Sequence, residues 1–423
     1  MDKISAPSGI ELPVVDAKDL YVREAYKSLH DTILDKLNMD SRHIVVTGTT
    51  GVGKSAFLVY FAIRLLAENS PREPLIPRAK TVIAASPKTL YSDAQFKDVE
   101  KEISWKYHMA PWDLDELKEC RNTVANFENI PEEVVVELYS KIGGVPRYVL
   151  KWARQGLTRY PEDLEKVKSE ACERLEQAIK LVDDPVKLMQ CFSQAGESLE
   201  FSSRLLHRWP NDDDHRSYRL EWASTHVLEK ITASVSQDAW NQVLEQLIKG
   251  NKGSDYGVMF EAYVLRTFRQ GGKTFEIRDL GTREVASLEF KKDPDVDRFD
   301  VIPAAKAGKL CIPRICNYAC IDMLRAPNDL FQITTSNGHL IKGQPLVALL
   351  HKLEQAGWTV DEARFIFVVP GDVYDGFRKQ NYLKPDGTAY ERIPKEIQLL
   401  KQYVLKIDLK AAVSGNSPGL NAK

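Results

Sequence analysis

The sequence has no long run of apolar residues. No stretch of its 423 residues approaches the roughly 18 apolar residues of a membrane-spanning helix, so we expect no membrane segment. The first residues also lack a basic start followed by an apolar stretch, and no targeting segment is visible. Hydrophobic residues form 43% and charged residues 28% of the chain, which indicates a globular protein and excludes a disordered or collagen-like one.

Cysteine is scarce, with six in the whole chain. A disulfide-stapled protein carries a higher density, so we expect free thiols in a reducing compartment. Cys311, Cys316 and Cys320 lie close together with His339 downstream, but their spacing is not the paired spacing typical of zinc sites. We therefore predict ordinary buried thiols rather than zinc ligands.

The chain also lacks a strong overall charge. It carries 58 Lys and Arg against 60 Asp and Glu, a net charge of -2. Residues 251–423 hold 25 Lys and Arg and 21 Asp and Glu, which gives this part a net charge of +4. That excess is compatible with nucleic-acid binding, and it would suit a slightly basic surface equally well.

The length and the turn-rich breaks predict several domains of α/β class. Helices are expected from Pro87 to about residue 190, with interruptions at Pro131 and at Gly143–Pro146. Beyond residue 250 the pattern predicts helices at 256–268 and 346–355 and strands at 274–277, 286–290, 299–302, 318–323, 330–335 and 364–369. We predict a first α/β domain over 1–160, a helical linker or lid over 161–250, a second α/β domain over 251–410 and a disordered tail over 411–423.

One motif predicts a phosphate-binding loop. It lies between a predicted buried strand and a predicted helix, and it fits G-x-x-x-x-G-K-[ST]. Its glycines allow backbone N–H groups to surround phosphates, its lysine reaches the β- and γ-phosphates, and its serine is a magnesium ligand. We predict that ATP or another nucleoside triphosphate binds here with Mg²⁺, at the residues Gly48, Thr49, Thr50, Gly51, Val52, Gly53, Lys54 and Ser55.

Hydrolysis would need one more group, an acidic residue at the end of a neighbouring strand that holds magnesium through water. Between Ser55 and Ser86 no acidic residue follows an apolar strand. The sequence therefore predicts nucleotide binding and does not predict hydrolysis. Arg147 is a candidate sensor of the γ-phosphate, and an ordinary surface arginine is the alternative.

A second constellation of polar residues lies in the C-terminal part. Glu261 interrupts an apolar predicted helix, and Asp322 falls late in a predicted strand. Gln332 and Thr334 share a face of the next strand. An acid on a helix, an acid on a strand and polar residues on the next strand resemble a restriction-endonuclease-type core, in which acidic side chains hold magnesium and the metal activates water.

In this interpretation Glu261 and Asp322 hold the metal. The third motif of such a core is Glu-x-Lys, and this chain has Gln332-Ile333-Thr334 in its place. Lys342 or His339 would then supply the positive charge. The alternative is a partly buried polar cluster that orders the sheet.

Five motifs together resemble one family: Leu20–Tyr26, Gly48–Ser55, Ala84–Pro87, Met109–Arg121 and Gly143–Leu150. In this order they resemble the Crinkler effectors of oomycetes and fungi and the related retrotransposon hot spot proteins of trypanosomes. The resemblance covers nearly the whole chain, and Asn317–Lys342 is similar to the nuclease core of that family. It implies a P-loop NTPase domain with a helical extension, followed by a restriction-endonuclease-like α/β domain.

The resemblance also implies a function. Such proteins are thought to act on nucleic acid, DNA rather than RNA, in a nucleus that is often that of a host cell, and to promote DNA damage or cell death. Two features depart from the family pattern. The N-terminal translocation segment is missing from this chain, and residues 67–80, with three prolines, stand where the family has a strand with an acidic magnesium ligand.

Three functions stay open at this stage. The leading hypothesis is an effector-like protein in which an NTP-binding module controls a Mg²⁺-dependent DNA nuclease. The second is a degenerate protein that binds nucleotide and DNA or a host protein without cutting. The third is a signalling ATPase whose C-terminal half is a sensor or scaffold.

Overall fold

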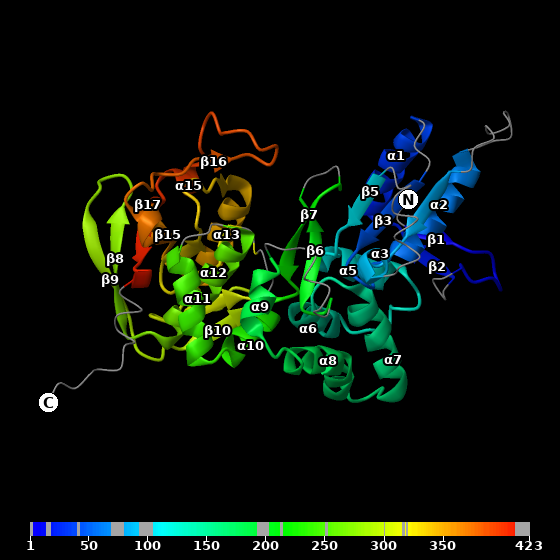
Figure 1. Ribbon diagram of the computed structural model, residues 1–423, viewed down its shortest axis with the longest axis horizontal. Helices are drawn as coiled ribbons and strands as arrows, with labels where there is room; N and C mark the ends of the chain where they lie inside the picture. Colours follow the sequence, from blue (N-terminus) through cyan, green and yellow to red (C-terminus); the bar gives the residue numbers. More distant parts are fainter. Residues whose placement is uncertain are drawn as a thin grey trace. The chain divides into compact units, whose positions relative to one another are not determined.

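The computed structural model shows a mixed α/β chain made of two compact units (Figure 1). The first unit comprises Met1–Asp183 and Gln194–Lys230, and the second comprises Asp184–Ser193 and Ile231–Lys423. The predicted α/β class is confirmed. The predicted tail, 411–423, lies outside the described residues, which are 3–13, 18–39, 43–68, 80–92, 105–192, 203–211, 215–249, 253–299, 301–314, 318 and 320–410.

A three-stranded parallel sheet forms the centre of the first unit. β3 (His43–Gly48) lies between β4 (Thr81–Ala84) and β5 (Trp105–Met109). Ile44, Val45 and Val46 are fully buried, as expected for a central parallel strand. The prediction of helices throughout the stretch after Pro87 is wrong at β5, which becomes a strand because β3 offers it a partner far away in the sequence.

Two helices flank the start of this sheet. α1 (Glu24–Asn38) and α2 (Lys54–Glu68) pack together through aromatic rings, with Tyr26 against Phe57 at 5.7 Å between centroids. A short antiparallel hairpin of β1 (Lys3–Ser5) and β2 (Asp19–Tyr21) precedes them. α3 (Pro87–Ser92) follows β4.

The helices after β5 begin and end where the sequence predicts breaks. α5 (Leu114–Thr123) starts at a capping box formed by Asp113 and Glu116. α6 (Glu132–Ile142) begins directly after Pro131 and ends at Gly143, whose φ is 77°. A π-helical turn (Arg147–Lys151), α7 (Trp152–Arg159) and α8 (Leu164–Lys180) complete this stretch.

A hairpin closes the first unit. β6 (Leu206–Pro210) and β7 (Tyr218–Trp222) are antiparallel, and β6 contacts β5 and β3 of the central sheet. The sequence analysis predicts no strand in this region. α10 (Thr225–Ser234) follows and continues across the division between the units.

The second unit contains an eight-stranded mixed sheet. Its strands β13, β15 and β17 are parallel, and β12 is antiparallel to β11 and β13. β8 and β9 form a hairpin beside β17 (Figure 1). The order is β10 (Val296–Phe299), β11 (Leu310–Pro313), β12 (Met323–Arg325), β13 (Asp329–Ile333), β15 (Arg364–Pro370), β17 (Lys401–Ile407), β8 (Lys273–Asp279) and β9 (Val285–Phe290).

Most of the strands predicted for this unit are confirmed, with two corrections. β10 ends at Phe299, so the strand predicted over 299–302 begins and ends too late. The strand predicted over 318–323 is wrong, since β12 starts only at Met323 and Asp322 lies just before it. Cys320 explains this difference, because its φ of 76° is incompatible with an extended strand.

Helices cover both faces of this sheet. α13 (Gly343–Gln355) buries leucines against Phe365 and Phe367 on one face. α12 (Ser254–Gln270) places Phe268 against Phe331 on the other face. Phe290 of the edge strand β9 also reaches Phe331, at 5.9 Å between centroids, so the sheet curls around α12.

The remaining elements of the second unit are short or peripheral. α9 and α11 both contact α12. No helix among the described ranges is long and apolar enough to cross a bilayer. The bounds are α9 (Pro185–Gln190), α11 (Gln237–Lys249), β14 (Ile341–Lys342), η3 (Val360–Glu362), α14 (Gly371–Tyr374), β16 (Tyr382–Leu383) and α15 (Lys395–Gln398).

Candidate functional site

The predicted phosphate loop joins β3 to α2, as its motif requires. Gly48, Gly51 and Gly53 have φ values of 139°, 93° and 100°, which residues with a side chain rarely adopt. A Cβ atom at Gly51 would lie 2.9 Å from Val145 Cγ1, and one at Gly53 would lie 2.4 Å from Tyr26 Oη. The backbone conformation and the surrounding side chains therefore both require glycine in this loop.

Lys54 is a buried cation, with only 8% of its surface exposed. Its Nζ donates to the carbonyl oxygens of Gly48 and Thr49, each at 2.9 Å. Burial and the positive charges of Arg147 and Arg208 lower the pKa of Lys54 to about 7. Among the described residues no carboxylate contributes to that shift, and the ammonium donates to the two carbonyl oxygens. A bound polyanion would complement it.

The two arginines approach the loop from different elements. Arg147, the predicted sensor, is exposed and lies next to Gly51, since a Cβ atom there would be 3.2 Å from Arg147 Cβ. Arg208 of β6 is 7% exposed, and its backbone N–H donates to Thr49 Oγ1 at 2.9 Å. Arg208 is not predicted from the sequence, because 159 residues separate it from the loop residue that it contacts.

Other sequence motifs also meet at this loop. Tyr26 Oη donates to the carbonyl oxygen of Gly53 at 2.9 Å, and Trp112 Nε1 donates to that of Val52 at 2.8 Å. Gly144 lies so close to Trp112 that an added Cβ atom would be 1.8 Å from the Trp112 carbonyl oxygen. Motifs far apart in sequence thus form a single shell around the phosphate loop.

An acidic partner for magnesium is missing from the described part of this sheet. Neither β4, which ends at Ala84, nor β5, which ends at Met109, is followed directly by an acid. The nearest carboxylate after β5 is Asp113, and its side chain caps α5 by accepting from the Glu116 N–H. Ser55 is exposed in the first turn of α2, where the motif predicts a magnesium ligand.

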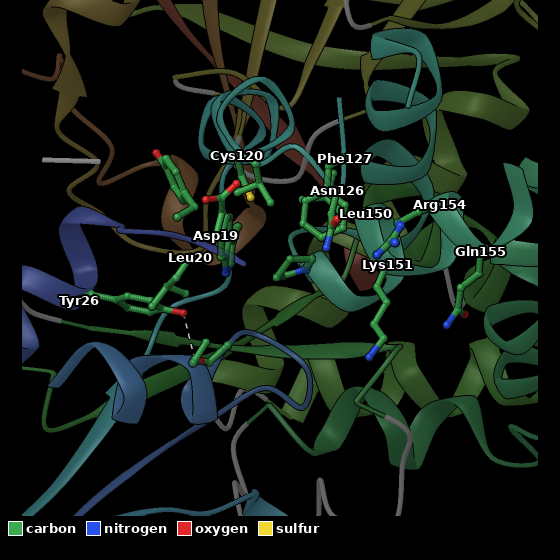
Figure 2. Close-up of a pocket in the computed structure, with 16 residues that line it drawn as sticks. Asp19, Leu20, Tyr26, Cys120, Asn126, Phe127, Leu150, Lys151, Arg154 and Gln155 are labelled. Atoms are coloured by element: carbon green, nitrogen blue, oxygen red, sulfur yellow. Dashed lines mark hydrogen bonds between the residues drawn. The ribbon is translucent and has the colours of Figure 1, made fainter. Parts of the chain in front are cut away.

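A cavity of about 370 Å³ opens beside the end of the loop. Gly53 and Ala56 contribute to its lining, together with the aromatic side chains of Tyr21, Trp112 and Phe127. Figure 2 shows Lys151, Arg154 and Gln155 on one side of the cavity and Asp19, Leu20 and Tyr26 on the other. The cavity therefore combines an apolar, aromatic lining with cationic side chains.

In the second unit, Asp322 and Gln332 form a direct pair. Asp322 Oδ2 accepts from Gln332 Nε2 at 2.8 Å and from the Ile333 N–H at 2.5 Å. Burial raises the pKa of the Asp322 carboxyl to about 7. Both hydrogen bonds recorded among the described residues go to Oδ2, which leaves Oδ1 available to a cation.

The other residues predicted for this site lie at the same end of the sheet but in different surroundings. Thr334 is buried and its Oγ1 accepts from the Ser336 N–H at 3.2 Å. The His339 ring packs on Phe367, and its burial lowers the histidine pKa. Lys342 is exposed, and its charge acts on the Cys320 thiol, as that of Asp322 does.

Glu261 approaches this end of the sheet from the opposite face. Its helix, α12, packs on Phe331, whereas Gln332 is paired with Phe367 and so points toward α13. One turn before Glu261, a Cβ atom at Gly257 would be 3.9 Å from Thr335 Oγ1. The structure thus brings Asp322 and Gln332 together and places Glu261 across the sheet from them.

Metal ligands do not assemble in clusters in the described part of the chain. No group of three or more His, Cys, Asp and Glu is arranged to hold a metal ion there. Cys120, Cys172, Cys191 and Cys311 are free thiols, as predicted, and all four are buried. Cys320 is a partly buried free thiol, and Cys316 lies outside the described residues.

Comparison with known proteins shows which proteins the chain is similar to. No family model matches the chain. Two curated relatives, Crinkler effector proteins 15 and 16 of Phytophthora infestans, are each 24% identical over 87% of this chain. The chain is thus similar to Crinkler effector proteins over most of its length. It spans just under two thirds of the two relatives, 66% and 65% of their lengths.

The Crinkler resemblance predicted from five motifs is therefore confirmed, while the likeness to the trypanosome proteins stays a prediction. The structure gives the motifs a common location. The Ala84–Pro87 motif is tied to β3, since the Ala85 N–H donates to the Val46 carbonyl oxygen at 3.0 Å. Together with the contacts of Tyr26, Trp112 and Val145, this places all five Crinkler motifs on or beside the phosphate loop and its strand.

Proposed function

We propose that this chain is an effector-like protein in which a nucleotide-binding module controls a magnesium-dependent nuclease site that acts on DNA. The observation that carries the nucleotide part is the buried Lys54 ammonium in a glycine-rich loop, where no carboxylate among the described residues contributes to its pKa shift. The observation that carries the nuclease part is the Asp322–Gln332 pair at the end of two neighbouring strands.

The first unit would bind a nucleoside triphosphate such as ATP along the loop. Backbone N–H groups of the glycine loop would surround the phosphates, and Lys54 would exchange the Gly48 and Thr49 carbonyls for phosphate oxygens. The adjoining cavity supports this proposal, because its aromatic lining at Gly53 and Ala56 suits the base and ribose. Ser55 would contact a magnesium ion that accompanies the nucleotide.

We propose that the bound nucleotide is not rapidly hydrolysed, because the acidic residue that hydrolysis needs does not follow a strand next to β3. A hydrolytic P-loop enzyme needs an acidic residue after a neighbouring strand, and neither β4 nor β5 is followed directly by one. We therefore assign the nucleotide a regulatory role. The same observation disfavours the signalling ATPase considered from the sequence.

In the second unit, Asp322 would be the main metal-holding residue. Magnesium is often bound through one or two carboxylates, with the remaining ligands from water and substrate phosphate, so a single buried aspartate suits it. Gln332 fixes the orientation of Asp322 through Oδ2 and leaves Oδ1 for the ion. When bound, the ion would activate a water molecule and stabilise negative charge on the phosphate. Lys342, exposed nearby, would offset the charge of the DNA backbone.

The strand order supports a restriction-endonuclease-like core. β11, β12 and β13 are antiparallel neighbours, and α13 then leads to β15, which is parallel to β13. Asp322 and Gln332 lie at the edge where β13 and β15 both end. Glu261 would contribute only if its side chain reached around that edge.

The proposed site of action is supported by the names of the relatives and by the charge of the C-terminal part. The two similar proteins are named effectors, and the net charge of +4 over residues 251–423 favours contact with nucleic acid. We propose a nucleus, that of a host cell, as the place where this activity is expressed.

Two observations favour a second function. The described residues hold no three-ligand metal cluster, and Thr334 stands where a catalytic lysine is expected. A degenerate protein that binds DNA or a host protein without cutting would have these features. It predicts DNA binding that weakens as salt increases, with no cleavage under any metal.

The deciding experiment is incubation of the purified full chain with plasmid DNA and Mg²⁺ or Mn²⁺. We expect cleavage by the wild type and at least a hundredfold loss in Asp322→Asn, because the amide cannot hold the metal. Asp386→Asn is the matched control, since Asp386 is an exposed turn residue of the same unit. Absence of cleavage by folded wild-type protein would favour the degenerate binding protein instead.

Nucleotide control is measured in the same assay. Lys54→Ala should abolish ATP binding, followed by calorimetry, and should remove any response of cleavage to added ATP. If cleavage by Lys54→Ala still responded to ATP as in the wild type, the loop would not be the regulatory site.

A further inference from the structure

Two segments of the second unit join on its surface beside Asp322. Residues 337–342 lie against residues 376–384, where the Ile341 N–H donates to the Asn381 carbonyl oxygen at 3.0 Å and β14 runs parallel to β16. The two segments together contain four Lys and Arg and no Asp or Glu. A charge of one sign therefore gathers here, in a chain whose overall charge is almost balanced.

The first of these segments lies at the Asp322 end of the sheet. Burial raises the pKa of the Cys320 thiol, the charge of Asp322 raises it further and the charge of Lys342 lowers it. The thiol is thus close to both the acid and the lysine. The His339 ring of the same segment packs on Phe367, in the strand next to β13.

Two buried glutamines fix the second segment to the sheet and to the first. Gln380 is 8% exposed, and Gln402 of β17 is 3% exposed. The Gln380 N–H donates to Gln402 Oε1 at 2.8 Å, and Gln402 Nε2 donates to the Gln380 carbonyl oxygen at 3.0 Å. Gln380 Oε1 also accepts from the His339 N–H at 2.7 Å. Both segments are therefore held in one arrangement, so little ordering is needed when a partner binds.

Three exposed cations lie on this surface, namely Lys342, Arg378 and Lys379. None of the three forms an ion pair with a carboxylate in the described part of the chain. Arg378 Nη1 donates to the carbonyl oxygens of Asp375 and Phe377, at 3.1 and 3.4 Å, and both bonds use that one nitrogen. The rest of the guanidinium and the two lysine ammonium groups are thus available to an anion.

We infer that Lys342, Arg378 and Lys379 form a contact surface for the phosphate backbone of duplex DNA and place the duplex at Asp322. This inference rests on the proposed action on DNA, and it adds two binding residues outside the candidate metal site. Neighbouring cations without carboxylates suit a polyanion that carries a charge on every phosphate, and the arginine fork suits a pair of phosphate oxygens. Contacts with the backbone carry no sequence information, so we expect this surface to bind DNA of any sequence.

The test is the affinity of the full chain for two short DNA duplexes of unrelated sequence. Fluorescence anisotropy in EDTA measures it, since metal-dependent cleavage does not occur there. The double variant Arg378→Gln with Lys379→Gln should bind both duplexes more weakly by the same factor, about tenfold or more at ~0.1 M salt. The slope of log affinity against log salt should become shallower by about 2, because two phosphate contacts are lost.

Lys291 and Lys292 provide a matched control, because they are an exposed basic pair of the same unit. They lie beside Gly271 at the C-terminal end of α12, whereas Gly257, near its other end, lies beside Thr335. The rise of a helix places these two glycines about 20 Å apart, so the control pair is far from the proposed surface. Lys291→Gln with Lys292→Gln should change DNA affinity by less than about twofold.

A swap that keeps both charges guards against misfolding. Arg378→Lys with Lys379→Arg should bind DNA within about threefold of the wild type, because phosphate contacts depend chiefly on charge. An equally large loss in the swap, or no loss in Arg378→Gln with Lys379→Gln, would overturn the inference, while plasmid cleavage in Mg²⁺ would still report separately on the nuclease. A wild-type protein that binds polyglutamate but not DNA would overturn both the inference and the proposed action on DNA.

Discussion

Arg23 and Glu116, 93 residues apart in the chain, form a two-pronged ion pair. Arg23 Nε lies 2.8 Å from Glu116 Oε1, and Arg23 Nη2 lies 2.6 Å from Oε2. The arginine is 2% exposed, donates to the carbonyls of Ala110 and Pro111, and lies 4.6 Å from the centre of the Trp112 ring. The pair thus joins the start of α1 to the tryptophan that holds the phosphate loop.

Removal of this pair should destabilise the first unit. Glu116→Ala leaves the Arg23 charge buried without its partner and removes part of the cap of α5, so we expect a loss of about 3–5 kcal/mol in the free energy of unfolding. Urea unfolding measures it, with the exposed Asp115→Ala as control. The loss in the free energy of unfolding caused by Arg23→Leu should be smaller in the Glu116→Ala protein than in the wild type. Equal costs in both backgrounds would mean that the pair is not coupled.

The loop glycines allow a second prediction. Gly51→Ala should weaken ATP binding by about tenfold or more, because the new methyl group would lie 2.9 Å from Val145 Cγ1 and displace the loop. Gly9→Ala is matched for backbone strain, since Gly9 has a φ of 81° and nothing within 4 Å of an added Cβ atom. It should cost about 1 kcal/mol in stability and leave ATP affinity unchanged. Unaltered binding by Gly51→Ala would contradict the assigned loop.

His207 should make the first unit acid-sensitive. It is 1% exposed, and burial lowers its pKa from 6.5 to about 3. In the unfolded chain His207 is protonated below about pH 6.5, whereas in the folded chain it stays neutral down to about pH 3. The free energy of unfolding therefore decreases as pH falls through this window. Between pH 7 and pH 4, the free energy of unfolding should therefore fall by about 3 kcal/mol less in His207→Gln than in the wild type. Denaturant unfolding at both pH values measures this, and the exposed His351→Gln should behave like the wild type.

Asp329 should act as a structural acid, in contrast to Asp322. It is 2% exposed, and its two carboxylate oxygens accept from Arg325 Nε at 2.8 Å and from Arg364 Nε at 2.7 Å. Asp329→Ala leaves both arginines without that partner and should cost about 3–5 kcal/mol in the stability of the second unit. ATP binding by the first unit should stay unchanged in this variant. A stable Asp329→Ala protein would show that the cluster contributes little.

The sequence alone determined the features that depend on local geometry. The glycine turn between β3 and α2 could be predicted from Gly48 to Ser55, because positive-φ glycines followed by a helix are encoded within eight neighbouring residues. The helix breaks at Pro131 and Gly143 were readable for the same reason, since proline and glycine act on their own backbone. Asp322 and Gln332 were both assigned to one candidate site from the sequence, but the hydrogen bond between them was not predicted.

The tertiary structure decided what depends on contacts between distant segments. β5 is a strand only because β3 lies beside it, and Asp322 lies before its strand because Cys320 turns the chain. Glu261 and Asp322 fall on opposite faces of a curled sheet, which no residue spacing specifies. Arg208 reaches Thr49 from 159 residues away, through a hairpin whose position follows from packing. Backbone conformation is a local property of the chain, whereas the residues that surround a buried charged group are set by the whole fold.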